Sequence, residues 1–119
     1  MVKLVFALRR LPHLSREEFQ RYWREKHAPL VEKHRAALGI RRYVQAHTRE
    51  TPANEGLRQS RGAPEAFDGV AELWFESAEL PATPAAATAA KELYEDERRF
   101  IDHARSPIWL ADEHPVLSP

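Results

Sequence analysis

The chain has 119 residues, about one domain's length, and 18 Lys and Arg residues balance 18 Asp and Glu residues. This zero formal charge argues against a nucleic-acid binder, which carries a basic excess to neutralise phosphates. The absence of cysteine excludes disulfides, thiolate metal sites and a cysteine nucleophile. No apolar run approaches the ~20 residues of a membrane span, and the first ten residues lack the pattern of a signal peptide. We expect one soluble, cytoplasmic domain over residues 1–119, with neither nucleic acid nor membrane as a partner.

The first predicted element is a strand over residues 2–9. Every second residue from Val2 onward is apolar, and the intervening set includes Val5 and Ala7, so both faces of this strand are expected to be covered. After a turn, Ser15-Arg-Glu-Glu18 forms a capping box, which predicts the start of a helix.

The predicted helix has one apolar face on which Trp23 and His27 lie one turn apart. Pro29 cannot supply the backbone amide that the preceding turn needs. We therefore expect a kink or short break near residues 26–28, with His27 at it, and an end of the helical segment at Gly39.

Residues 40–48 form the second predicted strand, in which Tyr43 and His47 share one face and Ile40 lies on the other. Residues 49–67 are polar and contain both proline and glycine, and we expect a loop or lid there.

Residues 70–76 predict a third strand. Thr83 and Pro84 have the character of an N-cap and a first helical residue, and the helix that they begin should run to about residue 101. Residues 108–112 form a short final strand.

The resulting order, βαββαβ, predicts an α+β fold of ferredoxin-like type with a four-stranded antiparallel sheet. Two helices can cover only one face of such a sheet, whereas the first and third predicted strands are apolar on both faces. A homodimer formed through the open sheet face is the simplest way to cover the second face.

Histidines are the main candidates for chemistry, because the chain has no phosphate-binding loop, nucleophile elbow or zinc-protease motif. We predict no cofactor and no metal. His27 and His47 can point into one space between helix and sheet, where either would move a proton near neutral pH. Structural roles for each, and metal binding by the pair with a carboxylate, remain open alternatives.

Several large aromatic residues, among them Tyr22, Trp23, Tyr43 and Trp74, can form either the walls of a cavity or a core and dimer interface. Glu72 is flanked by apolar residues on its strand face, so it is either an ion-pair partner at an interface or an acid with a raised pKa.

A resemblance to a known family rests on three segments: Tyr22-Trp-Arg-Glu-Lys-His-Ala-Pro-Leu30, Tyr43-Val-Gln-Ala-His47 and Phe67-Asp-Gly-Val-Ala-Glu-Leu-Trp-Phe-Glu76. Together they resemble the EthD family, and the resemblance extends over nearly the whole chain. It implies a dimeric α+β barrel, with a ligand site between the sheet and the helices.

Relatives of that family include cofactor-independent isomerases, decarboxylases, cyclases and oxygenases. By this resemblance, His27 and His47 match the family's helix and strand histidines, and Tyr43, Asp68 and Trp74 match neighbouring positions. Haem-binding relatives carry a ligand histidine on the second helix, which has none here, so haem is disfavoured.

The leading hypothesis is a cofactor-independent enzyme that moves a proton on a small hydrophobic oxygenated metabolite, as an isomerase, decarboxylase or dehydratase. His27 would be the general base or acid, and His47 and Tyr43 would orient or stabilise an enolate-like oxygen. The expected substrate-binding residues are Tyr22, Trp23, Asp68, Glu72 and Trp74. The alternatives are a cofactor-free oxidoreductase or monooxygenase and a non-catalytic binding protein of a degradation pathway.

Overall fold

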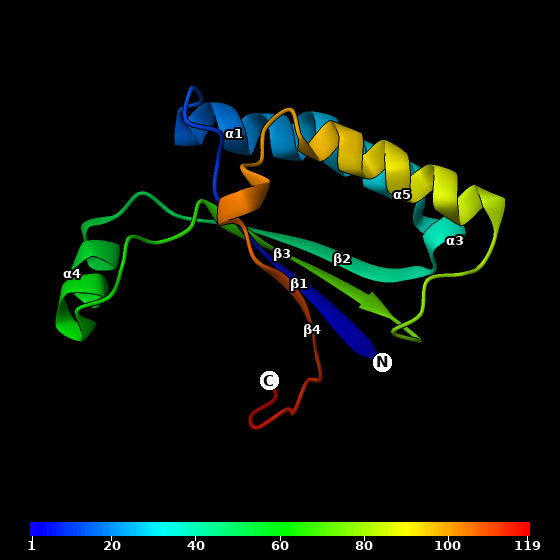
Figure 1. Ribbon diagram of the computed structural model, residues 1–119. Helices are drawn as coiled ribbons and strands as arrows, with labels where there is room; N and C mark the ends of the chain where they lie inside the picture. The colour runs from blue at the N-terminus through cyan, green and yellow to red at the C-terminus, as the bar shows by residue number, and fades with distance from the viewer.

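The computed structural model describes residues 1–119 as a four-stranded antiparallel sheet with helices on one face (Figure 1). The strands are β1 (Val2–Leu8), β2 (Ile40–His47), β3 (Gly69–Phe75) and β4 (Ile108–Ala111). Their order across the sheet is β2-β3-β1-β4, and every neighbouring pair is antiparallel. This topology confirms the ferredoxin-like α+β fold expected from the sequence.

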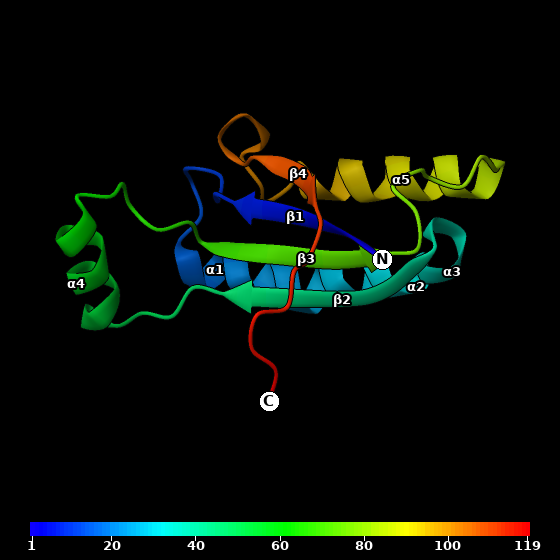
Figure 2. The ribbon, with the colours of Figure 1, turned by 90° about the horizontal axis from the view of Figure 1, so that it is seen from below.

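Helical segments after β1 and β3 form the second layer. The first set is α1 (Arg16–Tyr22), the π-helical turn η1 (Trp23–His27), α2 (Ala28–Lys33) and α3 (Arg35–Leu38), and the second is α5 (Pro84–Glu97) with the 3₁₀ turn η2 (His103–Arg105). Figure 2 shows the sheet from its other side, where no helix covers it and the C-terminal segment crosses below the strands. None of the helices is long and apolar enough to cross a membrane.

The start of α1 is the predicted capping box. The Ser15 hydroxyl accepts the Glu18 amide at 3.0 Å, and a Glu18 carboxylate oxygen accepts the Ser15 amide at 2.9 Å. Two of the free amides of the first turn are thereby satisfied, which fixes where the helix begins.

The break predicted ahead of Pro29 is the π-helical turn η1. The Ala28 amide donates to the Trp23 carbonyl, five residues back. Because Pro29 has no amide to continue the α-helical pattern, the wider turn lets the helix proceed into α2 without a sharp bend. Both Trp23 and His27 are buried on the side of the helix that faces the sheet.

Strand β2 departs from the predicted alternation at its first residues. Ile40 pairs with Phe75 and Arg42 with Trp74, so Arg41 is an extra residue in a bulge. The bulge turns Ile40 to the helix side of the sheet, where it is buried. The prediction that Ile40 lies on the face opposite Tyr43 was therefore wrong.

The segment 49–67 is not only a loop, because it contains helix α4 (Pro52–Arg61). The Thr51 hydroxyl accepts the Ala53 amide at 3.4 Å at one end, and Gly62 ends the helix in a left-handed conformation at φ 60°. No residue of α4 is buried, and the helix stands away from the sheet and from the other helices (Figure 1).

Helix α5 begins as predicted, with the Thr83 hydroxyl accepting the Ala86 amide at 3.1 Å, but it ends at Glu97 rather than near residue 101. The turn that follows brings Ile101 back to pair with Arg10 in an isolated bridge.

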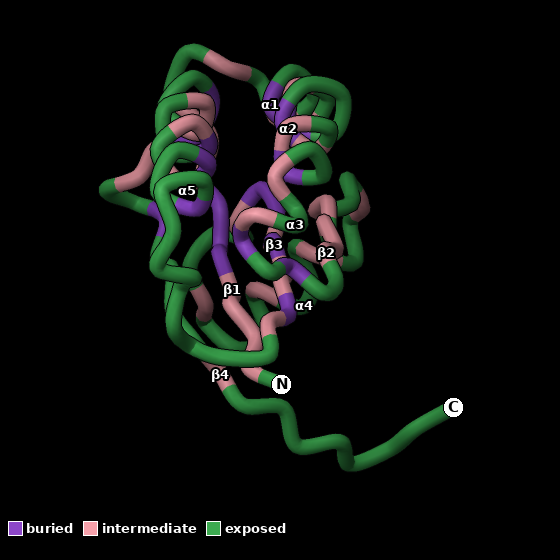
Figure 3. The backbone as a smooth tube through the Cα atoms, turned by 90° about the vertical axis from the view of Figure 1, so that its right-hand side faces the viewer, coloured by how far each residue is buried: buried purple, intermediate pink, exposed green.

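Buried residues (purple in Figure 3) occur both on the strands and on the helices. Their side chains form two clusters in the core between the sheet and the helices. One is built around aromatic residues and the other around aliphatic ones. The aromatic cluster comprises Phe6, Leu8, Phe19, Trp23, Ala71, Phe100 and Ile101. The aliphatic cluster comprises Val31, Leu38, Ile40, Ala86, Ala89 and Leu93.

Candidate functional site

A cavity of about 290 Å³ lies between the sheet and the helices. Its walls draw on both core clusters and on all four strands, and 17 of its 19 lining residues are hydrophobic. The exceptions are His27 and Glu97. Leu80, Tyr94 and Ile108 belong to the lining and are also exposed, so they lie where the cavity meets solvent. Such a cavity suits a small, mostly apolar molecule that makes few polar contacts.

His27 stands in this lining with one ring nitrogen already engaged. Its Nδ1 lies 2.8 Å from Oδ2 of Asp96, and the Tyr22 hydroxyl donates to Oδ1 of the same carboxylate at 2.7 Å. In the tautomer that donates a hydrogen bond from Nδ1–H to this carboxylate, the lone pair of the neutral ring is on Nε2.

The second ring nitrogen of His27, a residue that lines the cavity, has no hydrogen-bond partner. Nε2 makes no hydrogen bond within the protein, and no fully buried side-chain nitrogen or oxygen in the chain lacks a partner. Nε2 is therefore not fully buried, although the whole residue is only 5% exposed. A histidine held by a carboxylate at one nitrogen and open at the other has the arrangement of a general base.

Tyr43 lines the same cavity, and a chain of hydrogen bonds orients its hydroxyl. His47 Nε2 lies 2.8 Å from Oε1 of Gln45, and the Gln45 amide donates to the Tyr43 oxygen at 2.7 Å. With its oxygen already accepting, the hydroxyl has its proton left to donate. Burial raises the pKa of Tyr43 to about 12, so the phenol stays neutral.

His47 does not line the cavity. Its ring stacks on Trp23 with the ring centroids 4.4 Å apart, and Trp23 stands between it and the space that His27 faces. Burial, with a smaller contribution from the charge of Arg24, lowers the pKa of His47. A neutral His47 fits its bond to the Gln45 oxygen, which needs only one N–H.

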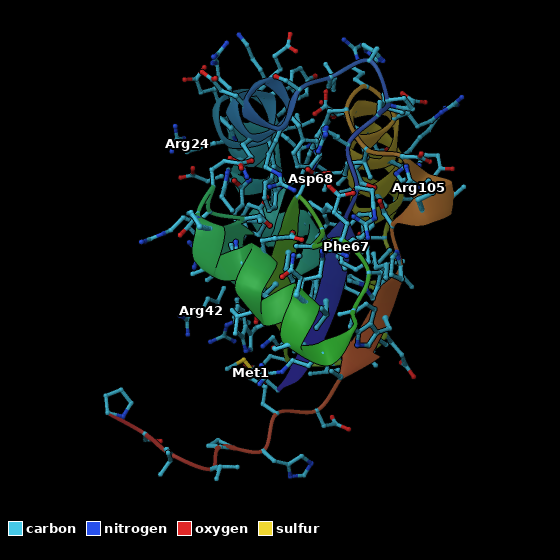
Figure 4. The ribbon with its side chains drawn as sticks, turned by 90° about the vertical axis from the view of Figure 1, so that its left-hand side faces the viewer. Met1, Arg24, Arg42, Phe67, Asp68 and Arg105 are labelled. Carbon is cyan, nitrogen blue, oxygen red and sulfur yellow. The ribbon has the colours of Figure 1, made fainter.

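Asp68 lies at the end of the sheet beneath the helix layer, outside the cavity (Figure 4). It is buried, and its carboxylate pairs with the guanidinium groups of Arg10 and Arg16 and accepts the Arg10 amide at 2.8 Å. Burial alone would raise its pKa, but these donors outweigh burial and lower the pKa of Asp68. This carboxylate ties the β1–α1 turn to the start of β3.

Glu72 and Trp74 are on the open face of the sheet, opposite the cavity. Glu72 pairs with Lys3, and the Trp74 indole donates to Glu113 of the C-terminal segment. Arg42 lies over the Trp74 ring at 4.7 Å from its centroid. The structure therefore divides the expected substrate-binding residues. Trp23 lines the cavity, Tyr22 lies behind the lining and binds Asp96, and the other three residues lie elsewhere.

Three residues near the cavity, Asp96, Glu97 and Tyr94, were not anticipated. Asp96 and Glu97 end the helix α5, and each binds a different histidine. A signal for Glu97 was present, because it follows Leu93 on the apolar stripe of the helix, where a carboxylate is unusual. No group of three or more His, Cys, Asp or Glu side chains has the geometry to hold a metal ion.

Comparisons with known proteins agree with this architecture. The family model for the EthD domain matches residues 11–104. A crystal structure of an ethyl tert-butyl ether D (EthD) family protein from Bacillus halodurans C-125 is similar, with a TM-score of 0.61 and 19% identity over 96% of this chain and 99% of that one. At this identity the similarity concerns the fold. No curated protein matches. Since the family model spans most of the sequence, the chain belongs to the EthD family.

Proposed function

We propose that this protein is a cofactor-independent enzyme that moves a proton on a small, largely apolar carbonyl compound. The observation that carries the proposal is His27, which lines a mostly apolar cavity with its Nδ1 held by Asp96 and its Nε2 without a partner in the protein. Isomerisation, decarboxylation and dehydration all pass through an enolate-like species, which this site can form and hold.

In the proposed step, His27 Nε2 removes a proton from the carbon next to the carbonyl. The C–H electron pair moves to the carbonyl oxygen, and the positive charge that develops on the imidazole is stabilised by Asp96. Tyr43 donates its hydroxyl proton in a hydrogen bond to the enolate oxygen. Gln45 and His47 act as positioning residues, because they direct that hydroxyl without touching the cavity.

The test uses a defined probe, cyclohex-3-en-1-one, in deuterated buffer, with proton NMR to follow loss of the hydrogens next to the carbonyl. The wild-type protein should accelerate exchange, and His27→Asn should reduce the acceleration by about 10²-fold or more. His34→Asn is the matched control, since His34 also binds a carboxylate, that of Glu92, but lies outside the cavity. Equal exchange by wild type and His27→Asn would overturn the proposal.

Other outcomes of that experiment identify the alternatives. Saturable shifts of the probe's resonances without exchange would indicate a binding protein. Consumption of dioxygen in an oxygen electrode, again without exchange, would indicate a cofactor-free oxygenase. Native mass spectrometry of the purified protein, before any probe is added, would identify a ligand that co-purifies with it.

We also infer that the protein works as a homodimer joined through the open sheet face. Val5, Val44 and Val70 project from that face together with Trp109, which is 46% exposed, and the Lys3–Glu72 pair lies among them. The valines and Trp109 form an apolar area on this face, and the charged Lys3 beside it is paired with Glu72 and Glu113; such an area favours burial against an identical face.

Sedimentation equilibrium should give twice the 13.7 kDa chain mass. Val5→Asp places a negative charge between its cross-strand neighbours Glu72 and Trp109 and should yield monomers. Leu57→Asp is the control, because Leu57 is also apolar and is exposed, but lies on α4, away from the sheet. A wild-type protein of monomeric mass would contradict the inference.

A further inference from the structure

Glu97 is the one carboxyl group in the lining of the cavity. It comes directly after Asp96 at the end of α5, and the two side chains diverge to different histidines. Asp96 binds His27, whereas Glu97 Oε1 lies 3.0 Å from Nε2 of His103. Two adjacent carboxyl groups therefore hold two histidines, and each of the two pairs contributes one member to the cavity: His27 from the first and Glu97 from the second.

His103, which binds Glu97, is itself held in place by aromatic contacts. The His103 ring stacks on Tyr94 with centroids 4.9 Å apart and lies 6.4 Å from the ring of Phe6. Only one carboxyl oxygen of Glu97 has a partner, and no fully buried side-chain oxygen in the chain lacks one. The second oxygen is therefore not fully buried, and it belongs to a residue that lines the cavity.

The two carboxyl groups have different environments. Asp96 accepts two hydrogen bonds, from Tyr22 and from His27. Burial raises the pKa of Glu97, and the opposing effects of His103 and His27 are smaller. Glu97 thus holds a proton more firmly than an ordinary glutamate, as a group that returns protons to a substrate needs to do.

Resting on the function proposed above, we propose that Glu97 is the second catalytic residue and delivers a proton to a carbon different from the one that His27 deprotonates. The substrate class would be an apolar β,γ-unsaturated ketone or lactone, and the reaction a shift of the double bond into conjugation. Tyr43 would hold the oxygen between the two proton transfers.

The steps balance as follows. His27 Nε2 takes a proton from the α-carbon, and the electrons spread over a dienolate. The γ-carbon then takes the proton of the Glu97 carboxyl, and a new double bond remains between the α- and β-carbons. His27 is left protonated and Glu97 ionised, so exchange with water at the mouth of the cavity restores both groups. No oxidant or reductant is consumed.

The probe cyclohex-3-en-1-one separates the two roles, because exchange at the α-carbon and formation of cyclohex-2-en-1-one are measured in one NMR experiment. Glu97→Gln should keep α-exchange within about threefold of wild type and lose conjugated product by about 10²-fold. His27→Asn should lose both. Glu92→Gln, on the same helix and also bound to a histidine, should lose neither.

Each result has one meaning. If Glu97→Gln forms the conjugated ketone as fast as wild type, the role of Glu97 is overturned while that of His27 stands. If wild type and His27→Asn exchange equally, the proposed function itself fails. Circular dichroism will show whether Glu97→Gln is folded. If it is not folded, carbon-13 NMR of wild-type protein labelled at its glutamate carboxyl groups replaces the test. The spectrum must show one carboxyl whose pKa is above those of the other glutamates. The His103→Asn variant assigns that signal to Glu97, and its absence would overturn the proposal.

Discussion

The backbone and a buried indole come close together where β3 begins beneath the helix layer, which makes Gly69→Ala a sharp test of how the cavity wall is packed. A Cβ atom at Gly69 would lie 2.5 and 2.9 Å from two ring carbons of Trp23 and 2.8 Å from the Ala46 carbonyl oxygen. Carbon atoms in contact are usually about 3.5–4.0 Å apart. The indole would therefore have to move by about 1 Å.

Neither neighbour can yield easily. Trp23 is 1% exposed and is held between the rings of His47 and Phe19. The Ala46 carbonyl belongs to β2, which is paired with β3 up to this point. We expect a cost near the upper end of the usual range for overpacking, about 2–3 kcal/mol. For a chain of this length, that corresponds to a fall in Tm of about 8–12 °C.

The assay is thermal unfolding followed by far-ultraviolet circular dichroism, with tryptophan fluorescence to report on the indole. Gly56→Ala is the matched control, because nothing lies within 4 Å of a Cβ at that position in α4. Alanine is the better helix former, so the control should not lower Tm. A Gly69→Ala variant that melts within 2 °C or so of wild type would refute the argument that the indole is locked.

Two further predictions concern stability and pH. The folded-state pKa of Asp68 is lowered, so its ion pairs stabilise the fold above the ordinary carboxyl range and cease to do so as the pH falls through the folded value. Asp68→Asn should cost about 2–3 kcal/mol at pH 7 in urea unfolding, and its stability should converge with that of wild type in acid; a constant difference down to pH 2 would contradict this. The pKa of His47 is also lowered, so stability is full above the ordinary value of 6.5 and declines below it as the unfolded chain takes up the proton. His47→Gln should flatten that decline between pH 7 and 5, and an unchanged slope would exclude His47 as its source.

Local signals in the sequence anticipated much of the fold. The reciprocal bonds of Ser15 and Glu18 depend on residues three apart, and the break before Pro29 depends on one missing amide. The helix start and the break before Pro29 each depend on residues no more than one helical turn apart. The sequence could therefore predict that His27 lies at the break. The open sheet face was likewise visible in the apolar residues on both sides of the first and third strands.

Features that depend on distant partners were not accessible in this way. Asp96 reaches His27 across 69 positions, and only the packing of α5 against η1 brings the two together. The bulge that turns Ile40 inward leaves no composition signal at Arg41. Helix α4 has caps at Thr51 and Gly62, but its polar composition is typical of a loop. Without an apolar face, the two capping residues alone do not predict a helix.

The π-helical turn has a consequence for how this site tolerates insertions and deletions. Each residue advances an α-helix by about 100°. The π-helical turn at Trp23–His27 therefore contains one residue more than an α-helical turn would need over the same length. Removing a residue there would let the segment relax to ordinary α-helix while α2 kept its contacts. Trp23 and His27 would then stand three residues apart in an ordinary α-helix, a spacing that keeps both side chains on the face toward the sheet. The wide turn therefore allows this segment to lose one residue without turning either side chain away from the sheet.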